Sequence, residues 1–182
     1  EIENVQLTNA STGGVVTAGN NFAGGMAGRA SGGNVSKVTV ENLQKVTTNN
    51  YAGGFVGYGG TGSLAETASL NILGLIEISN LLSLADGLQL QIQDSHVRGS
   101  QDGLTVIATG ESQDVSDIKK YYAGGFIGKS TSVKIEKANV TNLKNVSADM
   151  QNGCAGGFSG KNETGGLADA AGTDTEALKL LK

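Results

Sequence analysis

The chain of 182 residues contains no proline, no tryptophan, one cysteine, one histidine and only eight aromatic residues, four Tyr and four Phe. Although 29 residues are glycine, the absence of proline and of a Gly-X-Y period excludes a collagen-like triple helix. A single cysteine excludes an intrachain disulfide framework and a cysteine-rich zinc site. The net charge of −4 argues against a nucleic-acid binder that depends on phosphate contacts. The composition therefore indicates an ordered, glycine-rich chain with no expected cofactor.

An internal repeat accounts for much of the glycine. A seven-residue motif occurs at residues 22–28, 51–57, 122–128 and 154–160, and reads aromatic (once Cys), Ala, Gly, Gly, large apolar, any residue, Gly. Its structural glycines are Gly24, Gly25, Gly28, Gly53, Gly54, Gly57, Gly124, Gly125, Gly128, Gly156, Gly157 and Gly160. We expect them at tight corners, where a positive φ or a close approach of backbones excludes a Cβ atom.

A second motif precedes the first and consists of two β-branched or Leu residues five positions apart. The pairs are Ile2/Leu7, Val35/Val40, Ile92/Val97 and Ile135/Val140. In three units an asparagine follows, at Asn9, Asn42 and Asn142, and these side chains are expected to bond the backbone of the neighbouring unit. The two motifs together define a unit of about 29 to 33 residues with three short extended runs.

Short strands at one fixed period predict an all-β fold, a parallel β-helix or solenoid of about four coils, in one repeat domain over residues 1–182. Right-handed winding is the default for parallel crossovers. Equivalent residues would stack about 4.8 Å apart in internal columns. One column comprises Met26, Phe55, Phe126 and Phe158, and the other comprises Phe22, Tyr51, Tyr122 and Cys154. Cys154 is therefore expected to be a buried small hydrophobe and not a nucleophile.

The third unit departs from the repeat through insertions at about residues 64–91 and 99–120. The first is rich in Leu and Ile, and Asn80 and Gly87 have the spacing of the caps of a short helix, so a partly helical insertion is expected. Acidic residues interrupt it, which argues against a membrane span. Long loops on a rigid scaffold often bind ligands. The candidate binding residues are Leu75, Leu82, Asp94, His96 and Asp102. Alternatively, the Leu-rich insertion only covers a sheet face.

The two ends of the sequence also resemble parts of a unit. The chain starts inside a repeat, and residues 165–171 begin the same insertion again. We therefore expect a fragment of a longer array, with adjacent domains of the same precursor as its neighbours.

Few residues are suited to catalysis or metal binding. The only histidine, His96, lies near Asp94 and Asp102, and without a second histidine an exposed strand position is favoured over a metal or catalytic role. Three C-terminal acids could bind calcium, but their spacing matches neither an EF-hand loop nor the glycine-rich nonapeptide repeat. They are Asp169, Asp174 and Glu176. No catalytic or metal residue is predicted and the chain is not expected to be an enzyme. The alternative is a carbohydrate-active β-helix enzyme, or its ancillary module, that uses clustered carboxylates.

The segments 25–28, 54–57, 125–128 and 157–160 each read glycine, large apolar, any residue, glycine. This pattern resembles the GLUG-type repeats of large surface proteins of Gram-positive bacteria. The resemblance implies a secreted, cell-wall-attached protein at the extracellular surface, in which such arrays serve as stalks or adhesive regions. A host matrix protein or a glycan is the implied partner. No catalytic residue carries over, because the repeat motif contains none.

Overall fold

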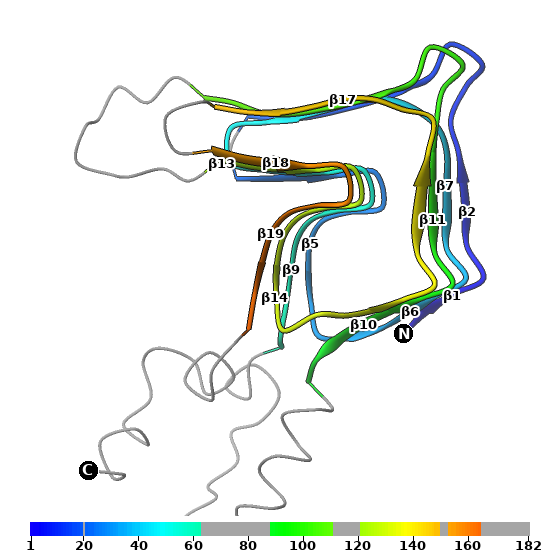
Figure 1. Ribbon diagram of the computed structural model, residues 1–182. Helices are drawn as coiled ribbons and strands as arrows, with labels where there is room; N and C mark the ends of the chain where they lie inside the picture. The colour runs from blue at the N-terminus through cyan, green and yellow to red at the C-terminus, as the bar shows by residue number, and fades with distance from the viewer. Residues whose placement is uncertain (20, 63–87, 111–120, 150–152, 165–182) are drawn as a thin grey trace, which may run out of the picture.

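The structure is a computed structural model that describes residues 1–19, 21–62, 88–110, 121–149 and 153–164 (Figure 1). Throughout these ranges the chain forms strands, turns and bends and contains no helix, which confirms the predicted all-β class. The predicted helix near Asn80 and Gly87 lies outside the described residues, as do the C-terminal acids. Of the two insertions, only residues 88–91 and 99–110 are described.

Four sheets of parallel strands make up the fold, and each sheet takes strands from all four repeat units. The first sheet contains β1 (Ile2–Glu3), β6 (Gly33–Ser36), β10 (Leu90–Gln93) and β15 (Lys134–Glu136). The second contains β2 (Gln6–Thr8), β3 (Gly14–Ala18), β7 (Thr39–Thr48), β11 (His96–Gly99), β12 (Leu104–Ala108), β16 (Asn139–Thr141) and β17 (Leu143–Ala148). The third contains β4 (Phe22–Gly24), β8 (Tyr51–Gly53), β13 (Tyr121–Gly124) and β18 (Gly153–Gly156). The fourth contains β5 (Ala27–Ser31), β9 (Val56–Gly60), β14 (Ile127–Thr131) and β19 (Ser159–Glu163).

Every pairing between the described strands is parallel, and the units pair residue by residue apart from register shifts in β3, β11 and β12 of the second sheet. In the first sheet Val35 pairs with Ile2 on one side and with Ile92 on the other, and Ile92 pairs with Ile135. The second motif of each unit pairs in the same way, from Leu7 through Val40 and Val97 to Val140. The four units therefore follow nearly the same nested path in space (Figure 1).

Each unit contains five extended segments and not the three that the sequence predicts, although in the second unit two of them merge into β7. The missed segments belong to the first and third sheets. The third-sheet strands share an Ala-Gly pair after an aromatic residue, or after Cys in β18, and Ala and Gly are both uncommon in strands. They are extended because each one pairs with the equivalent strand of the next unit, so tertiary pairing overrides local propensity.

The hydrophobic core lies inside the path that each unit encloses. Phe55 and Phe126 are fully buried, with ring centroids 4.6 Å apart and planes within 11°. The Phe158 ring stacks on Phe126 at 4.9 Å but is 38% exposed, because it belongs to the last unit described. Met26, the equivalent residue of the first unit, packs against the core and is partly buried.

Close backbone contact, and not a left-handed conformation, explains the glycine motif, since none of its glycines has a positive φ. A Cβ atom on Gly54 would lie 2.0 Å from the carbonyl oxygen of Gly125 in the next unit, and one on Gly53 would lie 2.0 Å from that of Val56. The positive φ angles occur elsewhere. The corner between the first and second sheets has φ between 48° and 55° at Asn4, Lys37, Asp94 and Lys137. Of the two alternatives expected for the motif glycines, the close approach of backbones is confirmed and the positive φ is not found.

Candidate functional site

The outward side of the second sheet is polar, because alternate residues of its strands point away from the core. We call this surface the polar wall; its first row contains Gln6, Thr39, His96 and Asn139, and its second row contains Thr8, Glu41, Arg98 and Thr141. The inward residues between the two rows are Leu7, Val40, Val97 and Val140. The strands thus combine an apolar inner row with a polar outer surface.

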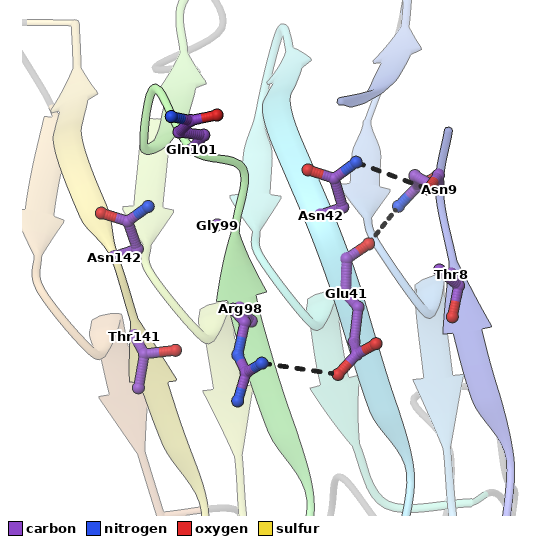
Figure 2. Close-up of a pocket in the computed structure, with 9 residues that line it drawn as sticks. All are labelled: Thr8, Asn9, Glu41, Asn42, Arg98, Gly99, Gln101, Thr141 and Asn142. Carbon is purple, nitrogen blue, oxygen red and sulfur yellow. Dashed lines mark hydrogen bonds and ion pairs between the residues drawn. The ribbon is translucent and has the colours of Figure 1, made fainter. Parts of the chain in front are cut away.

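A shallow pocket lies where the polar wall turns into the upper part of the second sheet (Figure 2). It is lined by Thr8, Asn9, Glu41, Asn42, Arg98, Gly99, Gln101, Thr141 and Asn142. The only ion pair drawn across it joins the Arg98 guanidinium to the Glu41 carboxylate at 3.9 Å, and the Arg98 side chain is 68% exposed. A surface pair at this distance contributes little to stability. The exposed Arg98 guanidinium is therefore available to a polar ligand, whereas Glu41 Oε2 also accepts a hydrogen bond from Gln6 Nε2 at 2.9 Å.

The asparagines of this pocket hold adjacent units together. Asn9 Nδ2 donates a hydrogen bond to the Glu41 carbonyl oxygen at 2.8 Å. Asn42 Nδ2 donates to the carbonyl oxygens of Asn9 and Ala10, and Asn142 Nδ2 donates to that of Ser100. Asn42 and Asn142 both have a φ of 56°, a left-handed conformation that asparagine tolerates better than most residues. The Asn amides therefore have a structural role, because they bond the backbone of a neighbouring unit.

The structure does not bring the candidate acids of the sequence analysis together. Asp94 occupies the corner before β11, where its carboxylate lies 3.9 Å from Lys137 Nζ, whereas Asp102 is exposed in the turn after β11. The four residues of β11 lie between the two acids and span roughly 13 Å, at about 3.3 Å per residue. Glycosidase carboxylate pairs lie about 5 to 9.5 Å apart. His96 lies on β11 itself, in the first row of the polar wall, while Leu75 and Leu82 lie outside the described residues.

A second surface, which we call the tyrosine–lysine strip, lies where the third and fourth sheets meet. One column, on the outer face of the third sheet, is Phe22, Tyr51 and Tyr122, with Cys154 next in line. The other column, on the fourth sheet, is Arg29, Tyr58, Lys129 and Lys161, with the carboxylate of Glu163 beside the two lysines. Both columns run across all four units.

The first column of the strip corrects one expectation. We expected it inside the core, but only Tyr122 is buried; Phe22 and Tyr51 are half-buried and Cys154 is exposed. Strand alternation directs the following alanine of the first three motifs into the core instead, whereas Cys154 and Ala155 are both exposed because they belong to the last unit described. Ala23, Ala52 and Ala123 are all buried. The expectation of a buried Cys154 is therefore wrong.

Stacked rings and cations form the body of the strip. Tyr51 stacks on Tyr122 with centroids 5.3 Å apart, and Phe22 lies 5.3 Å from Tyr51 on its other side. Lys129 Nζ lies 5.8 Å from the Tyr51 centroid, 5.9 Å from that of Tyr58 and 6.0 Å from that of Tyr122. These distances permit cation–π attraction to three rings at once.

Charge pairing keeps the ions of the strip charged at neutral pH. Hydrogen bonds from Lys161 and then Lys129 lower the pKa of the Glu163 carboxyl to about 2. Burial opposes the charge of Lys129, but its hydrogen bond to Glu163 and the attraction of that carboxylate raise the pKa of Lys129 above its usual value. The pKa of Lys161 is raised chiefly by its hydrogen bond to Glu163. Burial raises the pKa of the Tyr51 hydroxyl, so that it stays protonated.

The sequence contains a signal for this strip that its analysis missed. The four residues of the second column lie three positions after Met26, Phe55, Phe126 and Phe158 in their units. Three of the four are cationic, which a search for charge at fixed repeat positions would have found. Within the described ranges no group of three or more His, Cys, Asp or Glu side chains could hold a metal ion.

Comparison with known proteins adds no relative. No family model matches the chain, and no curated protein or solved structure matches it. No helix among the described residues is long and apolar enough to span a membrane. The class that the fold defines is thus an all-β repeat protein of parallel strands.

Proposed function

We propose that this chain is a rigid, non-catalytic segment of a bacterial surface protein, built as a right-handed parallel β-helix that binds host glycan or matrix protein. The single observation that carries the proposal is the residue-by-residue register of the four units. Equivalent residues pair from the first unit to the fourth in every sheet. A chain that stacks in this way gains length with each unit, and each unit contacts only its neighbours.

Two further observations support a structural and adhesive role. Asparagine side chains and stacked rings join one unit to the next, which stiffens the array along its axis. The outward surfaces, in contrast, change from unit to unit. Variable side chains on a regular scaffold are where recognition is usually found. The resemblance to GLUG-type repeats adds the proposed location, the extracellular face of a Gram-positive cell wall.

The experiment that tests this proposal applies the whole chain to an array of glycans and matrix proteins, and incubates it with a panel of polysaccharides. We expect binding to at least one array component and no release of reducing ends from any polysaccharide. Release of reducing ends would overturn the non-catalytic proposal in favour of the carbohydrate-active alternative. An array with no binding at all would remove the adhesive part and leave a stalk.

A further inference from the structure

We infer that the tyrosine–lysine strip binds an acidic glycan, a linear polysaccharide that carries carboxylate or sulfate groups. The inference rests on the adhesive function proposed above, and names both the surface and the class of ligand. It comes from the charges, hydroxyls and spacing of the strip.

The strip has an excess of positive charge on an acidic chain. Arg29, Lys129 and Lys161 contribute three positive charges and Glu163 one negative charge, so their sum is 3 − 1 = +2, whereas the whole chain has a net charge of −4. Lys129 Nζ lies 2.9 Å from Glu163 Oε2, and Lys161 Nζ contacts Oε1 of the same carboxylate. Two ammonium groups thus share one carboxylate. A second anion would complete the pairing.

Donors remain free on the cations of the strip. An ammonium group has three N–H donors, and within the described residues Lys129 uses its hydrogen bond to Glu163 alone. Arg29 donates from Nε to Ser31 Oγ at 3.2 Å and has no ion-pair partner among the residues that the structure describes. Its guanidinium is exposed. These donors are suited to carboxylate or sulfate oxygens.

The spacing of the cations fits a polymer better than a small anion. Adjacent units lie about 4.8 Å apart along the stack, so Lys129 and Lys161 are about 5 Å apart in register and Arg29 lies about 10 Å before Lys129. The cations therefore form a row along the axis of the units, about 14 Å long. A linear chain with regularly placed negative charges can pair with all three at once.

The arrangement of the rings favours a glycan over a nucleic acid. Proteins that bind single-stranded nucleic acids offer open aromatic faces on which bases stack. Here the face of Tyr51 is stacked on Tyr122 at 5.3 Å, with Phe22 against its other side, so no face of Tyr51 is open to a base. The hydroxyls of Tyr51 and Tyr58 form no hydrogen bond within the described part of the chain. Hydroxyls and ammonium groups match the oxygen atoms of an acidic sugar.

The test measures binding of the whole chain to three immobilised probes: heparin, which is sulfated; polygalacturonate, which is carboxylated; and dextran, which is neutral. We expect binding to heparin or polygalacturonate that weakens as salt increases, and none to dextran. The stronger of the two acidic probes identifies the anionic group. The double variant Lys129→Gln/Lys161→Gln should bind the preferred probe at least about tenfold more weakly, the effect of one lost charge-assisted hydrogen bond.

The matched control is Lys37→Gln/Lys134→Gln, which removes two exposed lysines away from the strip and should change binding less than about twofold. The Lys129 side chain is only 19% exposed, so its substitution also disturbs packing. Arg29 is exposed, so the variant Arg29→Gln removes one cation of the strip and leaves the packing intact. An equal loss in the control pair, or tighter binding to an oligo(dT) strand than to either acidic glycan, would overturn the inference. Array binding that the strip variants leave unchanged would overturn the inference while the proposed function stands. No binding to any array component would reject the inference together with the adhesive part of the proposed function.

Discussion

Two aromatic columns run through the same four units. They share the period of the repeat but differ in burial and in the polar groups beside them. The phenylalanine column, Phe55 and Phe126 with Met26 and Phe158 at its ends, is enclosed by the sheets and has no polar atom. The tyrosine column of the strip lies on the outer face of the third sheet beside lysines, with Phe22 and Tyr51 half-buried and Tyr122 buried. A fixed repeat therefore produces a stack without deciding which side of the sheet it occupies.

The difference has an energetic consequence. The rings of Phe55 and Phe126 are removed completely from water, so burial of their whole apolar surface contributes to stability. Phe22 and Tyr51 of the tyrosine column keep part of their surface in water, so their burial contributes less to folding. The first column should therefore dominate stability, and the second should dominate binding.

The strongest test of this comparison is Phe126→Ala. The side chain is fully buried between two other rings, so its removal leaves a cavity and should lower the free energy of unfolding by about 4 kcal/mol. Urea denaturation measures the change. Phe158→Ala removes the same side chain at a position that is 38% exposed and should cost clearly less. If both substitutions lowered the free energy of unfolding equally, the burial of a ring would not determine how much it contributes to stability.

The next largest effect is expected at Gly54→Ala, because the new Cβ atom would lie 2.0 Å from the Gly125 carbonyl oxygen. The two backbones must separate beside the phenylalanine column, at a cost of about 3 kcal/mol in the free energy of unfolding. Gly157→Ala is the matched control: it occupies the same column, but among the described residues its Cβ would meet only Leu143, at 3.9 Å. Thermal and urea unfolding of both variants would show the difference. A stable Gly54→Ala protein would contradict the close-contact explanation.

A smaller loss is expected at Tyr51→Ala, about 1 to 2 kcal/mol, because the half-buried ring loses its stacking on Tyr122 and its contact with Lys129. Tyr51→Phe keeps the ring and should be close to the parent protein in urea denaturation. If Tyr51→Ala were as destabilising as Phe126→Ala, the tyrosine column would have to be counted as core.

The smallest effect concerns pH. The pKa of Glu163 falls from 4.5 to about 2 in the folded chain, so its ion pairs stabilise the fold above pH 4.5. This contribution should decrease as the pH falls from 4.5 towards 2, because the carboxyl then takes up its proton and releases both lysines. The contribution of these ion pairs is measured by comparing how the free energy of unfolding changes with pH in the parent protein and in the Glu163→Gln variant. Curves that stay parallel through that interval would show that Glu163 makes no such contribution.

Much of the fold could be predicted from the sequence, because repeats impose their own alignment. The pairs Ile2/Leu7 and Val35/Val40 are in register in the structure, and the strands are parallel as expected. The third-sheet strands could not be predicted, since each is only three or four residues long and ends in Ala-Gly, two residues that are uncommon in strands. The role of the motif glycines was only half foreseen, because the contact between Gly54 and Gly125 depends on how closely two units approach.

The candidate site was less predictable. Asp94, His96 and Asp102 are near in sequence, but β11 holds the two acids at its opposite ends. Lys129 and Glu163 are distant in sequence, and only the pairing of β14 with β19 brings them to 2.9 Å. Charge clusters that depend on strand pairing cannot be read from local spacing.

By itself the sequence determined the period, the parallel stacking and the residues that share a column, because a repeated motif can satisfy its backbone and bury its apolar residues by pairing with its own copies. Tertiary structure alone decided which column lies inside. Strand alternation and the fold of each unit direct Phe55 into the core and Tyr51 to the surface, where the fourth sheet places Lys129 beside it. The scarce aromatic residues are thus divided between stability and a surface with the chemistry for binding.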